Sequence, residues 1–128
     1  MVYEIRCQRT VVVKKKGIKI EKSEVGDKVI FYLDGEIDLT NNEYFHTELE
    51  KCIKNNIFNI IIHMANLRYI DSSGIGVIIK NLKAVVNKGG DIKFVCIPDH
   101  IMNIFKYVRL DRLFDIYNNE QKAIEAFK

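Results

Sequence analysis

The sequence predicts a single α/β domain whose mixed, mostly parallel sheet holds about four to five strands and is covered by about four helices. Two observations favour this fold class. Apolar segments rich in β-branched residues alternate with longer stretches in which apolar residues recur at helical spacing. In addition, 128 residues with 48% hydrophobic content are sufficient for one buried core.

The first half of the chain contains an N-terminal extension, two strands and a helix. Residues 1–17 hold two apolar segments, Val2–Ile5 and Val11–Val13, and we expect a short strand pair or a loose arm there. The domain proper spans residues 18–128 and begins with strands at 18–21 and 29–33. Thr40 and Glu43 form a capping box, which predicts the first helix. The apolar stripe of this helix is Phe45, Leu49, Cys52 and Ile53.

The second half repeats the alternation of strand and helix. A strand at 57–63 precedes a helix at 74–88, which ends at Gly89–Gly90. Its apolar residues at helical spacing are Ile75, Ile78, Ile79, Leu82, Val85 and Val86. We expect the helix to bury one face against the strand, through Ile75, Ile79, Leu82 and Val86. A strand at 92–97, a helix from Pro98 to about 108 and a strand at 113–117 follow. Asn118 and Gln121 form a second capping box, before a helix whose inward residues are Ala123, Ile124 and Phe127.

Composition argues against several classes of function. The net charge is only +3 and the basic residues are scattered apart from Lys14–Lys16, so we expect no direct nucleic-acid binding. No segment has the length of a membrane span or the pattern of a signal peptide, so we expect a cytoplasmic protein without membrane insertion. The three cysteines, Cys7, Cys52 and Cys96, lack metal-ligand spacing. They predict reduced thiols rather than a disulfide, and neither a metal nor a cofactor is expected.

The segment Ile70–Gly76 carries the residues with the most chemistry. Asp71, Ser72 and Ser73 lie between the predicted strand and helix, at a helix N-terminus with unpaired N–H groups and partial positive charge. A serine at this place caps the helix, acts as a nucleophile or carries a phosphoryl group. These residue types alone leave the three roles open.

Four motifs follow one another along the chain: Gly35–Asp38, Ile70–Gly76, Gly89–Gly90 before a strand, and Leu110–Tyr117 before Ala123. Together they resemble the STAS domain of the bacterial anti-sigma factor antagonists. The resemblance covers about residues 18–127. Three features depart from the family pattern: residues 1–17 have no counterpart, Arg109 replaces a small residue that is usually glycine, and His63 ends the central strand where an acidic or amide side chain is common.

The resemblance implies a phosphorylation-switched binding protein rather than an enzyme. Ser73 matches the serine that is phosphorylated in the family, and the implied partner is an anti-sigma factor that is also a serine kinase. Unmodified, the domain would bind this partner and free a sigma factor. Phosphorylated at Ser73, it would lose that affinity until a phosphatase reset it. The implied docking face surrounds Ser73 and comprises Asp38, Asp71, Ser72, Gly74, Ile75, Gly76 and Val77.

The residues of this face also have structural explanations. Asp71 is either a turn residue or a charge that orients the acceptor hydroxyl, and Asp38 either closes a strand or belongs to the docking face. Gly74 and Gly76 are expected to allow close backbone approach rather than to bind a nucleotide. Val77 is expected opposite the inward stripe, as an apolar contact for the partner.

The same serines would also be the candidate nucleophiles of an enzyme. Catalysis by Ser72 or Ser73 would require a histidine base, from His46, His63 or His100. The Gly-x-Ser-x-Gly pattern of a nucleophilic serine is absent, so we expect no enzyme. Two rivals remain: a STAS subunit or regulator of a membrane transporter, and a scaffold component of a stress-signalling complex.

Overall fold

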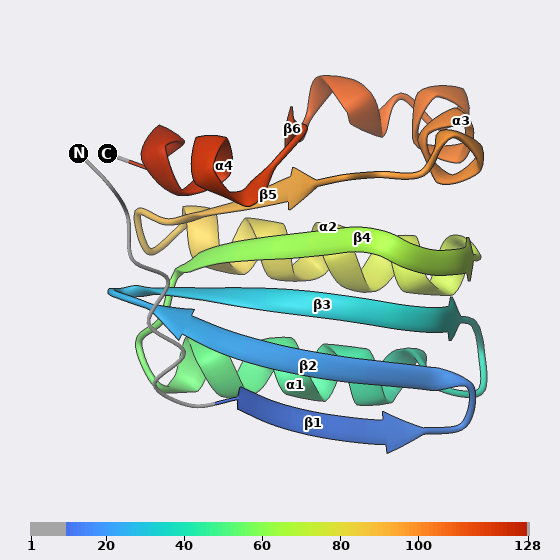
Figure 1. Ribbon diagram of the computed structural model, residues 1–128, viewed down its shortest axis with the longest axis horizontal. Helices are drawn as coiled ribbons and strands as arrows, with labels where there is room; N and C mark the ends of the chain where they lie inside the picture. The colour runs from blue at the N-terminus through green and yellow to red at the C-terminus, as the bar shows by residue number, and fades with distance from the viewer. Residues whose placement is uncertain (1–9, 128) are drawn as a thin grey trace.

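The structure is a computed structural model that describes residues 10–127, in which a six-stranded sheet carries helices on both faces (Figure 1). The strands lie side by side in chain order: β1 (Thr10–Lys15), β2 (Ile18–Val25), β3 (Lys28–Ile37), β4 (Asn59–Ile70), β5 (Asp91–Val95) and β6 (Asp115–Tyr117). The first three pair antiparallel, and β3 to β6 pair parallel. The predicted α/β class and mostly parallel sheet are therefore confirmed.

The sheet has more strands than the four to five predicted. The additional edge strand is β1, which comes from the segment treated as an N-terminal extension and pairs along its length with β2. The other apolar segment of that extension, Val2–Ile5, lies outside the described residues.

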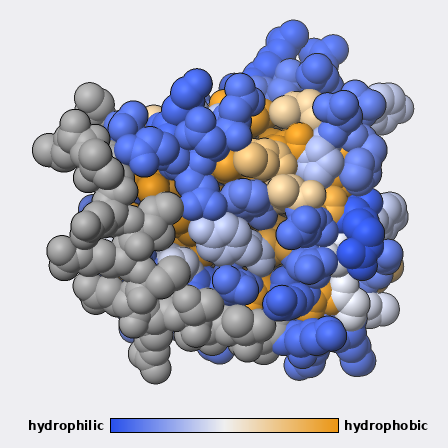
Figure 2. Space-filling model, viewed as in Figure 1, coloured by the Kyte–Doolittle hydropathy of each residue, from blue (hydrophilic) through white to orange (hydrophobic). Residues whose placement is uncertain are grey.

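Within residues 10–127, four α-helices and one 3-10 turn follow the strands along the chain: α1 (Asn42–Lys54), α2 (Ser72–Val86), α3 (Asp99–Tyr107), η1 (Leu110–Arg112) and α4 (Glu120–Ala126). Helices α1 and α2 lie behind the sheet as it is drawn in Figure 1. The main core lies between this face and α1, α2 and α3, and a smaller core lies under α4 on the opposite face. Hydrophilic side chains predominate on the described part of that opposite face (Figure 2).

Strand alternation explains the two cores. In β3, Phe31 and Leu33 face the main core, whereas Ile30 faces α4. In β4, Ile60 and Ile62 face the main core and Ile61 faces α4. A strand that is buried on both faces loses the polar alternation of a half-exposed strand, which is why these segments have continuous apolar sequences.

Both predicted capping boxes are wrong in detail. Helix α1 begins at Asn42 rather than Thr40, because the Thr40 hydroxyl donates to Asp38 instead of capping the helix. The last helix is capped by Asn119, whose side chain accepts from the Lys122 N–H group, and not by Asn118. The inward residues of that helix are as predicted for Ala123 and Ile124, while Phe127 is half-buried.

The inward face of α2 differs from the prediction. Ile75 is buried as expected, but Ile79 and Leu82 are half-buried and Val86 is 53% exposed. Of the apolar residues at helical spacing, Ile75, Ile78 and Val85 are buried, and the polar Asn81 completes this buried arc. The arc turns toward α1, where the Asn81 amide nitrogen lies 3.0 Å from Nδ1 of His46 and donates to the Val77 carbonyl. A polar residue inside the buried arc hides its direction from an apolar pattern.

Strand β4 continues to Ile70, well beyond the predicted end at 63. His63 therefore lies within the strand, where its ring packs against Tyr32 and lies near Glu120 of α4. Arg109 adopts a left-handed backbone with φ of 63°, a conformation that favours glycine. Arg109, where the family usually has glycine, therefore takes a backbone conformation that glycine adopts more easily.

Candidate functional site

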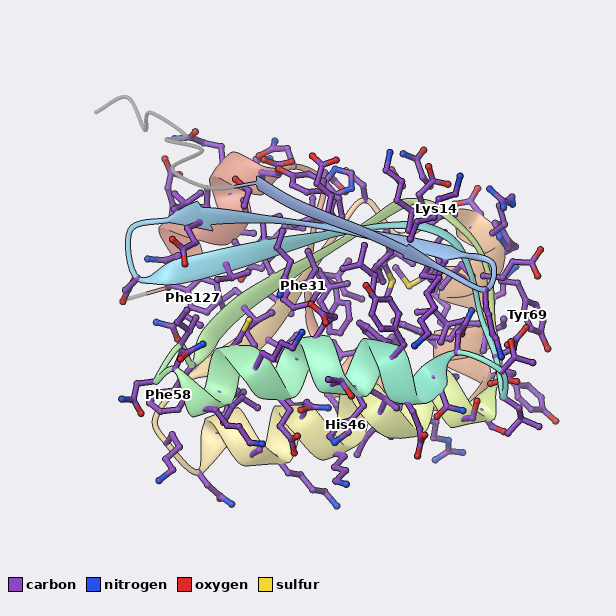
Figure 3. All side chains as sticks on the ribbon, turned by 90° about the horizontal axis from the view of Figure 1, so that it is seen from below. Lys14, Phe31, His46, Phe58, Tyr69 and Phe127 are labelled. Carbon is purple, nitrogen blue, oxygen red and sulfur yellow. The ribbon has the colours of Figure 1, made fainter. Side chains whose placement is uncertain are left out.

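The candidate site lies where β3 and β4 end side by side. Ile37 pairs with Ile70 at the carboxyl ends of these parallel strands, and the Asp71 N–H group donates to the Ile37 carbonyl at 3.1 Å. Asp38 and Asp71 follow the two paired isoleucines, so both lie at the same edge of the sheet. Tyr69, one residue before Ile70, lies at this end of the molecule, where α2 begins (Figure 3).

Asp71 is the N-cap of α2. Its Oδ1 accepts from the N–H groups of Ser73 at 2.9 Å and Gly74 at 3.3 Å. The same oxygen accepts from the Ser73 hydroxyl at 2.5 Å. The expectation that Ser73 itself could be the helix cap is therefore wrong: the cap is a carboxylate, and the serine hydroxyl is bonded to it.

The two serines differ in exposure. Ser72 is exposed and Ser73 is half-buried, and both belong to the first turn of α2. Because α2 has no acidic residue in that first turn, the Asp71 side chain is the carboxylate that satisfies its N–H groups.

Gly74 permits the close contact between α2 and the strand ends. A Cβ atom at this position would lie 2.7 Å from Cγ2 of Ile37 and 2.8 Å from Cγ1 of Ile70. The prediction of close approach is thus confirmed for Gly74. It is wrong for Gly76, which is exposed, because a Cβ atom there would meet nothing within 4 Å.

Ile75 and Val77 belong mainly to the interior. Ile75 is 8% exposed, and Val77 is half-buried and packs against the main core. The expectation that Val77 projects opposite the inward stripe is therefore wrong. The exposed surface of the first turns of α2 comes from Ser72 and Gly76.

Asp38 organises the turn between β3 and α1. Its Oδ1 accepts from the backbone N–H group of Thr40 at 2.9 Å and from the Thr40 hydroxyl at 2.6 Å. These bonds, led by the hydroxyl, hold the pKa of Asp38 below its usual range. The carboxylate is therefore a fixed negative charge at the strand edge.

Asn41 holds that turn in place through its buried side chain, a role that no sequence motif indicated. It is 3% exposed, and its Oδ1 accepts from the Asp38 N–H group at 3.0 Å. Its amide nitrogen donates to the Lys16 carbonyl at 2.8 Å and to the Glu36 carbonyl at 2.9 Å. One side chain thus joins the β1–β2 turn, the end of β3 and the Asp38 loop.

Two exposed apolar side chains also lie at this edge and were not identified from the sequence. Leu39 is 80% exposed and Tyr69 is 47% exposed. Leu39 could have been recognised in the sequence because it is an apolar residue between Asp38 and Thr40, inside a polar turn. For Tyr69 the signal was its place immediately before the Ile70–Gly76 motif.

The histidines considered as bases lie elsewhere. His46 packs against Asn81 between α1 and α2, His63 faces α4, and Nε2 of His100 lies 2.8 Å from the Arg68 carbonyl. Within residues 10–127, no group of three His, Cys, Asp or Glu side chains is arranged to hold a metal ion. None of the helices in that same range combines the length and apolar character needed to cross a membrane.

Comparisons with known proteins agree with this architecture. The family model described as "STAS domain" matches residues 19–123. A relative named "Anti-sigma F factor antagonist" from Paenibacillus polymyxa is 26% identical over 109 residues, which cover 84% of this chain and 93% of that protein.

Solved structures share the fold at low identity. The crystal structure of an anti-sigma factor antagonist from Mycobacterium paratuberculosis has a TM-score of 0.77 at 15% identity and covers 85% of this chain and 92% of that chain. SpoIIAA in its unphosphorylated form has a TM-score of 0.68 at 18% identity, covering 83% of this chain and 94% of that one. Murine Slc26a9, an anion transporter, also contains the fold, with a TM-score of 0.65 at 19% identity over 18% of its own chain.

Proposed function

Because the chain belongs to the STAS domain family, we propose that it is an anti-sigma factor antagonist controlled by phosphorylation of Ser73. The unmodified protein binds an anti-sigma factor that is also a serine kinase, and a sigma factor is thereby freed. A phosphate on Ser73 weakens the binding, and a phosphatase restores it.

The hydrogen bond between the Ser73 hydroxyl and the Asp71 carboxylate is the observation that carries this proposal. A carboxylate that accepts a hydrogen bond from a hydroxyl orients the lone pairs of the hydroxyl oxygen for attack on a phosphoryl group. Ser72 is more exposed, but no such bond orients its hydroxyl among the described residues. The proposal therefore assigns the phosphoryl group to Ser73 and leaves Ser72 unmodified.

The charges around Ser73 explain how a phosphate would act. A phosphate adds about −1.5 to −2 charges, beside a carboxylate that already accepts from the first N–H groups of α2. The phosphate and Asp71 then compete for the same partial positive charge of the helix. When a partner excludes water from this edge, the concentrated negative charge becomes more costly still, which favours dissociation.

The surface around Ser73 supports a protein partner. Leu39 and Tyr69 offer exposed apolar area, which is the usual source of affinity at the centre of an interface. Gly76 leaves the first turns of α2 without a projecting side chain, so a partner backbone approaches there freely. Ile75 and Val77 support this surface from beneath rather than forming it.

A relative also supports a switch that changes charge rather than fold. SpoIIAA is described in both an unphosphorylated and a phosphorylated form, and these align with this chain at TM-scores of 0.68 and 0.67. We expect the same of this protein: phosphate on Ser73 changes the docking surface while the sheet and helices stay in place.

Four variants test the proposal against the anti-sigma kinase of the same host. Ser73→Ala removes the acceptor, and Ser73→Glu places a negative charge at the same position; Ser72→Ala and Ser72→Glu are the matched controls one residue away. Ser73→Ala should bind constitutively and resist phosphorylation. Ser73→Glu should bind at least about tenfold more weakly, a loss of about 1.4 kcal/mol, in calorimetry.

The Ser72 variants should be phosphorylated at Ser73 and bind as the parent protein does. Phosphate on Ser72 by mass spectrometry, or equal affinities of Ser73→Ala and Ser73→Glu, would contradict the mechanism. Circular dichroism of each variant separates loss of binding from loss of fold.

A further inference from the structure

A second apolar surface lies at the other end of α2. A groove of about 340 Å³ separates the last turns of α2 from η1, and Ile79, Leu82, Val86 and Leu113 supply its apolar lining. Val86 is 53% exposed and Leu113 is 62% exposed, so both side chains are accessible. Neither residue contributes to the main core, which indicates that the groove is not a packing defect of the interior.

The groove is separate from the Ser73 site. Ser73 and Val86 are 13 residues apart on one helix, which corresponds to about 20 Å along its axis. A molecule in the groove therefore does not need to touch the Ser73 edge, and both surfaces could be occupied at once.

Basic residues predominate in the two segments that form the groove, and we call these residues its basic rim. Residues 72–88 contain three lysines and no carboxylate, and Lys83 lines the groove itself. Lys106, Arg109 and Arg112 are exposed on the segment that leads to Leu113, where Asp111 is the single acid between 106 and 113. In the described part of the chain, Lys83 forms no ion pair, so its charge at the groove is available to a ligand.

We propose that this groove binds an amphipathic helix of a partner protein that presents apolar side chains at helical spacing and carries Asp or Glu on either side. Apolar residues at i, i+3, i+4 and i+7 fit a groove between a helix and a turn, and acidic flanks match the basic rim. Two other occupants fit less well. A second copy would place one basic rim opposite another. Residues 1–9 carry Arg6 and Arg9 against the single Glu4, so their charge is also of the wrong sign.

A designed peptide tests the proposal directly. The probe is a fluorescein-labelled, capped peptide of about 14 residues with Leu at the four groove-facing positions and Glu on its flanks, a length that forms a helix only marginally when free. Two matched peptides replace every Glu by Lys or every Leu by Ser. Saturable binding of the acidic peptide alone, weakened by added salt, is the expected result in fluorescence anisotropy.

Variants of the protein locate the binding. Leu113→Glu and Val86→Glu should each weaken binding of the acidic peptide at least about tenfold. Both place a negative charge, of the same sign as the charge of the peptide, at an exposed apolar position of the groove. Lys83→Glu should weaken binding by a similar factor. Leu39→Glu, in the turn between β3 and α1 at the Ser73 edge, should leave the affinity for the peptide unchanged. Ser73→Glu should also leave it unchanged, which keeps this test independent of the phosphorylation switch.

Three results would overturn the proposal. The first is equal binding of the acidic and the lysine peptide, and the second is no saturable binding by the parent protein. The third is a dimer in analytical ultracentrifugation that dissociates on Leu113→Glu, which would make a second copy the occupant. Circular dichroism spectra of the Leu39, Lys83, Val86 and Leu113 variants should match the parent spectrum, since these side chains are exposed.

Discussion

The Asp71 carboxylate both caps α2 and accepts the hydrogen bond of the Ser73 hydroxyl. One oxygen atom therefore stabilises the helix and orients the proposed phosphoacceptor. A substitution of Asp71 should consequently affect both the stability of the domain and the phosphorylation of Ser73. Loss of the Asp71 oxygen and loss of its charge should have different effects.

Asp71→Ala should destabilise the domain by about 1 kcal/mol, because it leaves the first N–H groups of α2 without an acceptor. Asp71→Asn keeps an oxygen at the cap and should cost less than about 0.5 kcal/mol, since Asn is as good an N-cap as Asp. Urea denaturation measures both values. Equal losses in the two variants would mean that the charge of Asp71, rather than its oxygen, stabilises the helix.

The burial pattern of α2 predicts a graded response to truncation. Ile78→Ala should cost about 2–5 kcal/mol, because Ile78 is fully buried and its removal leaves a cavity. Leu82→Ala should cost about half as much, since Leu82 is only half-buried. Val86→Ala, at an exposed position, should change the free energy of unfolding by less than about 0.5 kcal/mol. A large loss at Val86 would show that the groove beside η1 is closed in solution.

The buried face of α2 differs from the predicted face, and the difference shows which features can be read from the apolar pattern of the sequence. Periodicity was sufficient to place α2 after a buried strand and to locate Ser73 at its start. It could not show that α2 also packs against α1, because that contact includes the polar pair of Asn81 and His46, which an apolar pattern does not reveal. For the same reason the end of β4 was missed: polar residues such as Asn66 and Arg68 interrupt the apolar pattern of a strand that continues to Ile70.

The candidate site was predictable in part. Asp38, Asp71 and Ser73 could be identified because short motifs hold them, and parallel pairing of Ile37 with Ile70 brings the motifs together. Asn41 could not, because a single buried amide in a loop has no periodic signal. Its three hydrogen bonds become visible only when Lys16, Glu36 and Asp38 are placed together in space.

Arg109→Gly should stabilise the protein by about 0.5–1 kcal/mol. An L-residue in the left-handed region costs roughly 1–2 kcal/mol, and glycine avoids this cost. Part of the gain is lost because glycine has more freedom to lose from the unfolded chain. Val108→Gly is the matched control, because Val108 has φ of −94° and gains nothing from glycine. Thermal denaturation should show a higher midpoint for the first variant and a lower one for the second. A lower midpoint for Arg109→Gly would mean that the arginine side chain contributes more than its backbone costs.

The described thiols should differ in reactivity. Burial raises the pKa of Cys52 to about 11, so almost none of it is thiolate near neutral pH. Cys96 is half-buried, and its Sγ lies 3.1 Å from the Asn118 carbonyl at the surface. Iodoacetamide labelling followed by peptide mapping should modify Cys96 at least about tenfold faster than Cys52. The intact mass without reductant should show three free thiols, which includes Cys7 outside the described residues; a deficit of two hydrogens would contradict this.

Stability should also fall as the pH drops below neutrality, and His63 should account for part of the loss. Burial lowers the pKa of His63 below its ordinary value, and attraction to Glu120 only partly opposes this. The unfolded chain therefore binds a proton near pH 6.5 that the folded protein resists, so acidification favours unfolding from about pH 6.5 down to the lower pKa of the folded state. Above that range the contribution of neutral His63 to stability is complete. His63→Gln cannot take up this proton and should flatten the pH dependence of the free energy of unfolding between about pH 7 and 5. An unchanged slope in urea melts of the variant would show that His63 remains solvated, and a proton NMR titration of its ring would then give an ordinary pKa.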